Sequence, residues 1–201
     1  SLSEAALSLE FYTLSAMITS SNVKSKIMNN EDLRLSTLRK KKLMPYGVDE
    51  SGGFHANYRL GVRADSFYEY LFKEFERSGN ATHFEHFLVA EREIRDKLHL
   101  NLDENTTFVG ERSAVGHFLP TMDHLVCFWP GVLALASKQK PQFLRDAQNI
   151  MHACLKMYDT PRGLAPEKFK KYRSTRLWST RVIDIICCAP KRWKASTFCG
   201  R

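Results

Sequence analysis

The sequence predicts an all-α protein in which helices pack against helices. Apolar residues recur at helical spacing in the first segment, residues 2–18, at Leu7, Phe11, Leu14 and Ile18. Further helical patterns follow one another along the chain, with loops of varied length and no alternation of strand and helix patterns. Because a parallel sheet would need that alternation, the order of patterns favours helix-on-helix packing.

The helical patterns can be followed in order as far as residue 158. The stretch LMPYGVDESGGF, which contains Pro45 and three glycines, is expected to break regular structure. Residues 101–121 are rich in turn formers, with TTFVG as one short extended piece, and Pro130 suits the first turn of a helix. The predicted helices are 2–18, 22–29, 65–76, 84–98, 130–136 and 142–158.

Composition and charge describe one globular domain followed by a basic segment. Of the 201 residues, 43% are hydrophobic and 26% charged, and no apolar run approaches the ~20 residues of a membrane helix. Residues 1–167 hold 20 Lys and Arg against 21 Asp and Glu, whereas 168–201 hold ten against one. The net charge of +8 therefore describes a tail, and we expect no nucleic-acid partner. Any targeting segment or membrane anchor would lie outside this chain.

Cysteines and sequons give weaker signals. The five cysteines are odd in number and lack the paired C-x-x-C spacing of a zinc site. Two Asn-X-Thr sequons, Asn80-Ala81-Thr82 and Asn105-Thr106-Thr107, fall in polar, turn-like stretches. Because such sequons also occur by chance, they favour a secretory-pathway protein only modestly.

The stretch GVRADSFYEYLFKEF, residues 61–75, has two interpretations when it is taken alone. Asp65 and Glu69 lie four residues apart and would share one face of a helix. Paired carboxylates beside aromatic rings are found in sugar-cleaving sites. An acid near the start of a helix, with apolar residues turned inward, is also an ordinary helix N-terminus.

Five phrases, in order, connect this stretch to a known family. They are EAALSLEF (4–11), RADSFYEYLFK (63–73), TTFVGE (106–111), MDHLVCFWPGVLAL (122–135) and GLAPE (163–167). Together they resemble the class I α-1,2-mannosidases, glycoside hydrolase family 47, and look more like its endoplasmic-reticulum processing branch than its degradation-enhancing branch. The resemblance implies part of an (αα)7 barrel of antiparallel helix pairs. It divides the chain into a partial catalytic domain, 1–167, and a divergent basic segment, 168–201.

The resemblance also implies roles for individual residues. Asp65 matches a catalytic carboxylate that acts on the attacking water, and Arg63 matches a residue that contacts the oligosaccharide. His124 and Glu167 match pocket residues that bind the sugar or hold calcium-bound waters. Glu4 matches another pocket acid, although the stretch that follows it is one residue shorter than in the family.

Each assignment has a plain structural alternative. Asp65 and Glu167 could be acids at helix starts, Arg63 a surface ion-pair partner and His124 a core histidine. For Glu69 we prefer the structural role, because an inverting glycosidase holds its carboxyl groups ~6.5–9.5 Å apart. Residues four apart on a helix have Cβ atoms only ~5–6 Å apart. Asp65 should therefore find its catalytic partners on other helices.

The resemblance finally implies a disulfide, a reaction and a compartment. Cys127 and Cys154 match the family's disulfide pair. The family removes terminal α-1,2-linked mannose from high-mannose N-glycans with inversion, using Ca2+, in the endoplasmic reticulum or Golgi lumen. Its general acid would lie upstream of this chain, and its RPE glutamate and calcium-binding threonine downstream. We therefore expect no turnover by this chain alone; the alternative is a truncated, non-catalytic product that at most binds glycan or partner proteins.

Overall fold

The computed structural model describes residues 54–170 continuously. It also describes 43–48, 35–40 and single positions nearer the N-terminus, at 10, 11, 13, 14, 17, 22, 25, 26 and 29. Every described position up to residue 40 is helical, so the helices predicted at 2–18 and 22–29 are confirmed at those positions. Glu4 and residues 171–201, which include three of the cysteines, lie outside the described residues.

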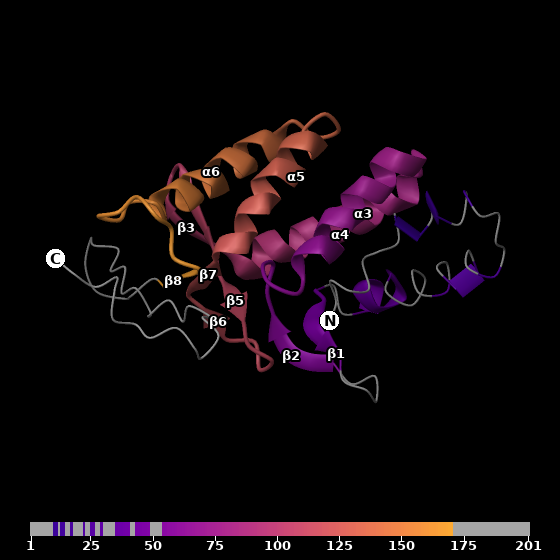
Figure 1. Cartoon of the computed structure of the whole chain (residues 1–201), viewed down its shortest axis with the longest axis horizontal. Coiled ribbons are helices and arrows are strands. Elements are labelled where there is room, and N and C mark those ends of the chain that lie inside the picture. The colour runs from indigo at the N-terminus through magenta and orange to yellow at the C-terminus, as the bar shows by residue number, and fades with distance from the viewer. Residues whose placement is uncertain are drawn as a thin grey trace, which may run out of the picture.

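Two helices in the middle of the chain form a hairpin (Figure 1). α3 (Asp65–Ser78) and α4 (Ala81–Leu98) correspond to the helices predicted at 65–76 and 84–98. α3 ends at Gly79, whose φ of 67° is left-handed and whose N–H donates to the Phe75 carbonyl at 2.8 Å. Glycine adopts this conformation at little cost, which explains the sharp end of the helix.

The second helical pair follows a short 3₁₀ helix. η2 (His124–Phe128) leads into α5 (Trp129–Ala136), and α6 (Gln142–Lys156) packs against α5. Pro130 lies in the first turn of α5, where its missing N–H costs nothing. The disulfide Cys127–Cys154 joins η2 to α6, with its Cα atoms 5.9 Å apart. The pairing implied by the family resemblance is therefore present.

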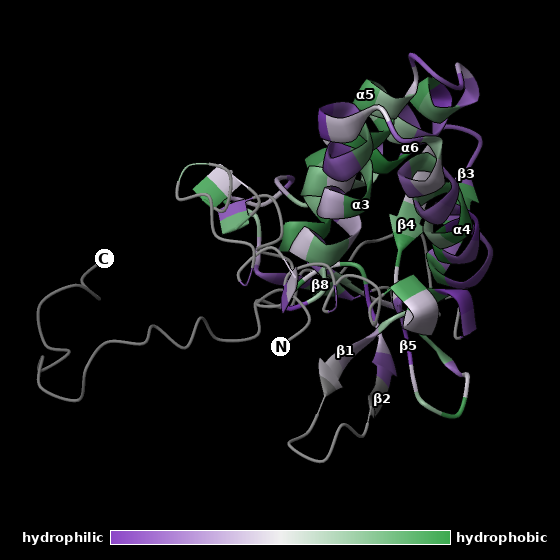
Figure 2. Ribbon diagram, turned by 90° about the vertical axis from the view of Figure 1, so that its right-hand side faces the viewer, coloured by the Kyte–Doolittle hydropathy of each residue, from purple (hydrophilic) through white to green (hydrophobic). Residues whose placement is uncertain are grey.

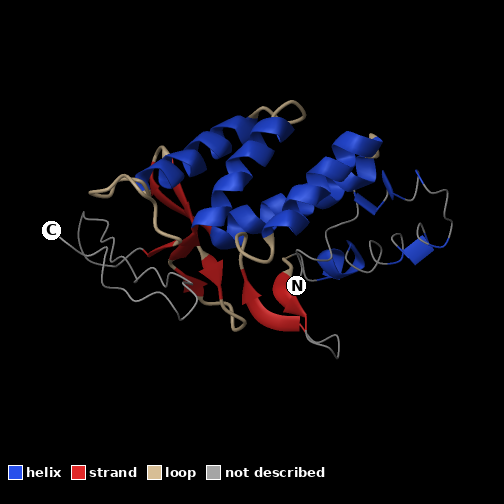
Figure 3. Ribbon diagram, viewed as in Figure 1, coloured by secondary structure: helices blue, strands red, loops and turns tan. Residues whose placement is uncertain are grey.

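The prediction of an all-α chain is wrong in detail, because the described residues also form eight short strands (Figure 3). β1 lies in the stretch expected to break regular structure, and β2 begins at the last residue of that stretch. β4, β5 and β6 lie within the turn-rich segment 101–121, and β3 and β7 overlap its two ends. The strands are β1 (Pro45–Val48), β2 (Phe54–Tyr58), β3 (His99–Asp103), β4 (Thr106–Val109), β5 (Glu111–Arg112), β6 (Phe118–Leu119), β7 (Thr121–Asp123) and β8 (Lys168–Lys170). Strands of two to five residues are too short to show a period, and all four residues of β4 are buried, so no alternation marks it.

The strands form three small antiparallel sheets on one side of the helices (Figure 3). Their orders are β1-β2-β5-β6, β3-β4 and β7-β8. In the last sheet Met122 lies opposite Phe169, whose side chain is 2% exposed. The described structure thus continues three residues beyond the domain boundary predicted at residue 167, and that boundary stays a prediction.

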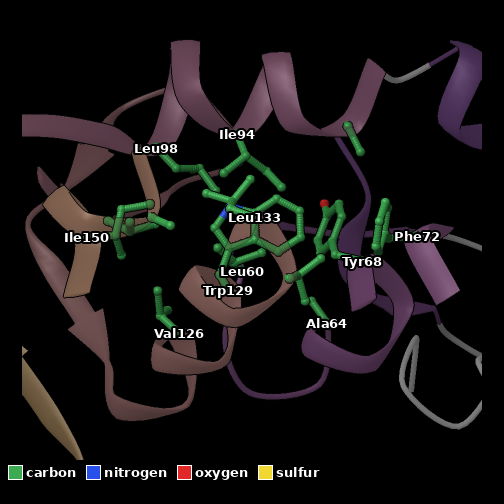
Figure 4. Close-up of a cluster of buried hydrophobic side chains, with 14 of the residues drawn as sticks. Leu60, Ala64, Tyr68, Phe72, Ile94, Leu98, Val126, Trp129, Leu133 and Ile150 are labelled. Carbon is green, nitrogen blue, oxygen red and sulfur yellow. The ribbon is translucent and has the colours of Figure 1, made fainter. Parts of the chain in front are cut away.

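A buried hydrophobic cluster, to which Tyr68, Phe72 and Trp129 contribute aromatic rings, packs between the helices (Figure 4). The ring of Phe87 in α4 lies 5.1 Å from that of Phe72 in α3, 5.7 Å from that of Trp129 in α5 and 5.9 Å from that of Phe143 in α6, centroid to centroid. Such pairs contribute ~0.5–1.5 kcal/mol each beyond the area they bury. One side chain therefore contacts an aromatic residue on each neighbouring helix.

The second helical pair is rich in apolar residues, and most of α5 is hydrophobic (Figure 2). Some apolar side chains of α6 also lie at the surface. Leu144, Met151 and Leu155 of α6 are 48%, 38% and 58% exposed. Their spacing of seven and four residues places them on one face of the helix. Exposed apolar residues on one helix face are typical of a surface that packs against further structure. Among the described residues, no helix combines the length and apolar character that crossing a membrane requires.

Candidate active site

A tight turn before α3 carries Arg63 and Asp65. The carbonyl of Gly61 accepts hydrogen bonds from the N–H groups of Ala64 and Asp65, both at 3.0 Å. Arg63 has a φ of 70°, the one positive value at a non-glycine residue in the described part of the chain. This conformation costs on the order of 1–2 kcal/mol, and residues held in it are often found at functional sites. The Arg63 side chain is exposed.

Asp65 is the first residue of α3 and is half-buried. Its Oδ1 accepts a hydrogen bond from the Ser66 N–H at 3.0 Å. The helix N-terminus stabilises a negative charge at this position. Glu69, one turn further on, pairs with Lys73, whose Nζ lies 2.7 Å from Oε1. The ion pair supports the structural role preferred for Glu69 in the sequence.

Two aromatic residues of α3 contact other parts of the chain. Phe67 is buried in the core. The hydroxyl of Tyr70 donates a hydrogen bond to the carboxylate of Glu10, in the N-terminal helical region. This hydrogen bond raises the pKa of Tyr70 to about 12. Tyr70 therefore connects α3 to the N-terminal part of the chain.

His124 and Glu167 meet through their backbones. The N–H of His124 donates to the carbonyl of Glu167 at 2.9 Å, and Nε2 of His124 lies 2.8 Å from the hydroxyl of Tyr158. His124 is only half-buried and begins η2, so it is not an enclosed core histidine. Glu167 is exposed and directly precedes β8, so it is not an acid at a helix start.

Gly61 is the point of contact between the turn that carries Arg63 and Asp65 and the segment that carries His124. A Cβ placed on Gly61 would lie 2.8 Å from the Cβ of Asp123, closer than Cβ atoms normally approach. Asp123 is 3% exposed, and its Oδ1 accepts the Leu125 N–H at 2.9 Å, which caps η2. The turn that carries Arg63 and Asp65 therefore lies against the residue next to His124. The segments that carry Arg63, Asp65, His124 and Glu167 are connected through these successive contacts.

Sequence reasoning missed three residues of this arrangement: Gly61, Asp123 and Tyr158. Asp123 carries a local signal, since an Asp directly before a helix is a common N-cap. The contacts of Gly61 with Asp123 and of Tyr158 with His124 join positions distant in sequence, so no local pattern marks them.

The described residues do not fit a complete calcium site. Among them, no group of three or more His, Cys, Asp or Glu side chains is arranged to hold a metal ion. Calcium takes six to eight oxygen ligands. Glu167 offers an exposed carboxylate, but Nε2 of His124 is engaged by Tyr158. We therefore derive no chemical step through a metal held by this part of the chain.

Comparisons with known protein families and solved structures establish the family of this chain and its fold. Residues 1–194 match the model of glycosyl hydrolase family 47. The chain belongs to this family. In structure, α-1,2-mannosidase from Trichoderma reesei superposes with a TM-score of 0.68 over 84% of this chain and 38% of its own, at 20% sequence identity. The family 47 chain and this mannosidase therefore share a fold.

Curated relatives of the family 47 chain carry mannosidase names. Mannosyl-oligosaccharide 1,2-alpha-mannosidase MNS3 of Arabidopsis thaliana is 34% identical over 192 residues, which are 81% of this chain and 31% of that protein. The human endoplasmic reticulum mannosyl-oligosaccharide 1,2-alpha-mannosidase is 36% identical over 138 residues, 64% of this chain and 20% of that protein. The chain thus spans less than a third of the length of either relative.

Proposed function

We propose that the protein containing this chain hydrolyses terminal α-1,2-linked mannose from high-mannose N-glycans with inversion. Family membership and the names of the relatives support the substrate class. The observation that carries the proposal is the contact of Gly61 with Asp123, which sets the turn of Arg63 and Asp65 against the segment of His124. The backbone hydrogen bond from His124 connects Glu167 to the same segment. These residues come from three separate segments of the sequence, as in a site built around a barrel axis.

In this proposal Asp65 acts on the attacking water and the other residues hold the sugar. The carboxylate of Asp65 lies at the N-terminus of α3, and its oxygens can accept a hydrogen bond from water. The exposed guanidinium of Arg63 presents several N–H donors to sugar hydroxyls. Because Glu69 is paired with Lys73, we assign the second carboxyl group of the inverting pair to another element.

The proposal assigns the remaining chemistry to residues outside this chain. The acid that protonates the leaving oxygen and the direct calcium ligand are expected there, and Glu4 is proposed as a further pocket acid. We also propose that the protein works in the endoplasmic reticulum or Golgi lumen, which the names of the endoplasmic-reticulum relatives and the disulfide support.

The experiment separates activity of the chain from activity of the longer protein. Purified chain is incubated with high-mannose glycan and calcium, and released mannose is measured. We expect no release, because loss of general acid–base help alone typically costs 10²–10⁴-fold. The longer protein should release mannose and lose this activity on Asp65→Asn. Release by the chain alone that disappears on Asp65→Asn would contradict the assignment of the general acid to a residue outside it.

The alternative is a chain that binds glycan without cleaving it. The exposed side chain of Arg63 could contact a bound glycan, so this alternative is tested through Arg63. Titration of the chain with high-mannose glycan would show saturable binding that weakens on Arg63→Ala. Arg92→Ala, on the exposed side of α4, is the matched control. No binding by the wild-type chain would remove this alternative.

A further inference from the structure

The two sequons differ in how their residues are held. N-glycosylation needs an exposed Asn side-chain nitrogen and an accessible hydroxyl two residues later. Both Asn80 and Asn105 are exposed. The Thr that completes each sequon, however, lies in a different environment, and this difference distinguishes the two sites.

Asn80 lies at the corner between α3 and α4 (Figure 1). All residues from 76 to 82 are exposed, including Thr82, which completes the sequon. Oδ1 of Asn80 accepts the Thr82 N–H at 3.0 Å and caps α4. This hydrogen bond uses the oxygen of the side-chain amide and leaves Nδ2 outside it, so a sugar on Nδ2 would not displace the cap.

Asn105 lies in the turn of the β3–β4 hairpin and is itself exposed, but the two threonines that follow it are buried. Its N–H donates to Asp103 Oδ1 at 2.9 Å, and its carbonyl lies 2.7 Å from Nδ1 of His152. Thr107, which completes the sequon, is 6% exposed and donates its hydroxyl to Asn101 at 3.0 Å. Once the hairpin has formed, a transferase could not reach Asn105 and the Thr107 hydroxyl together.

We propose that Asn80 is an N-glycosylation site of this protein and that Asn105 is not. In the transfer, Nδ2 of Asn80 forms a bond to C1 of a sugar carried by a lipid diphosphate. The bond from C1 to the diphosphate oxygen breaks, the lipid diphosphate leaves, and a proton of Nδ2 passes to a base of the transferase. The inference goes beyond the proposed hydrolysis and rests on the proposed lumenal location alone.

The glycan at Asn80 lies far from the candidate active site. α3 has 14 residues between the Asp65 turn and the Asn80 corner, which at 1.5 Å per residue separates them by about 20 Å. The modification therefore covers the solvent-facing corner of the helical hairpin, where it costs no packing contact of the core.

The test directs the chain into the endoplasmic reticulum, so that its glycosylation can be measured even if the proposed lumenal location is wrong. The full chain is expressed behind a cleavable secretion signal in cultured eukaryotic cells. Formation of the Cys127–Cys154 disulfide, read by peptide mapping, confirms delivery to an oxidising lumen. The protein is then treated with an amidase that releases N-glycans, and gel mobility and the Asn-to-Asp mass change are measured.

The variants separate glycosylation from folding. We expect the wild-type chain to shift on amidase treatment, with the mass change at position 80. Asn80→Gln and Thr82→Ala should abolish the shift, whereas Thr82→Ser, which keeps a sequon, and Asn105→Gln should retain it. Thr82→Ala preserves Asn80 as the helix cap, so loss of the shift there cannot come from a lost cap. An unshifted wild-type chain, or a shift that survives Thr82→Ala, would overturn the proposal.

Discussion

His99 shows how burial controls the charge of a single side chain. Its Nε2 is shut off from solvent and has no hydrogen-bond partner among the described residues. Burial, with a smaller contribution from the positive charge of Arg95, lowers the pKa of His99 to about 4, from an ordinary value of 6.5. The folded protein therefore keeps His99 neutral over a pH range in which the unfolded chain protonates it.

We expect acid to destabilise the fold through His99. Between pH 6.5 and pH 4 the unfolded state binds more protons, so the free energy of unfolding falls as the pH falls through this window. At about 1.4 kcal/mol per pKa unit, the full effect is on the order of 3 kcal/mol. Urea unfolding at the two ends of the window measures the slope.

Two substitutions test whether His99 is the cause. His99→Leu should flatten the dependence of the unfolding free energy on pH. His117→Leu, at an exposed position, should leave the wild-type dependence unchanged. An equal slope in wild-type protein and His99→Leu would contradict the assignment.

At the scale of elements, the turn before α3 packs tightly against β7, and each of them adjoins candidate residues. Gly61→Ala would place a Cβ 2.8 Å from that of buried Asp123. Because such overpacking typically costs 1–3 kcal/mol, we expect a loss of stability of about that size. Urea denaturation of wild type and variant measures the difference.

Gly131 provides a matched control for Gly61→Ala. It lies in α5, and a Cβ added there would meet nothing within 4 Å. Gly131→Ala should therefore be neutral or stabilising, by up to roughly 1 kcal/mol, since alanine has the higher helix propensity. Equal stabilities of Gly61→Ala and Gly131→Ala would show that the turn and β7 are not in tight contact.

At the scale of the whole molecule, the Cys127–Cys154 disulfide connects η2, which carries His124, to α6. Its sequence separation of 27 residues predicts a contribution of about 3 kcal/mol through the restricted unfolded chain. The double variant Cys127→Ser, Cys154→Ser should lose about this much in urea unfolding. Peptide mapping without reductant should find the pair linked, and linkage of either residue to Cys187, Cys188 or Cys199 would contradict it.

The length of the chain relative to its relatives is the reason why we expect the chain alone to be inactive. It spans 31% of the plant relative and 38% of the Trichoderma reesei structure. Exposed Leu144, Met151 and Leu155 form an apolar edge on α6, beside the face that packs in the core. In the proposed function, the site also draws on residues from helix pairs that lie outside this chain.

The sequence by itself determined the helices and the family. Amphipathic spacing predicted α3 and α4 without knowledge of any partner, but it ended the first helix at 76 rather than 78 and began the second at 84 rather than 81. Gly79 and Asn80 are the local signals that mark the observed end and start. The five ordered phrases carry the family, and the match over residues 1–194 confirms it.

TTFVG was predicted to be extended and contains β4, but only the tertiary structure decided how the strands pair and which candidate segments are in contact. β7 is three residues long, and its partner β8 begins 45 positions later at Lys168, so no local period could reveal the pair. The contact of Gly61 with Asp123 and the hydrogen bond between His124 and Tyr158 likewise join distant positions. Each depends on which surfaces the packed helices bring together, and this information is held by the whole chain rather than by any window of it.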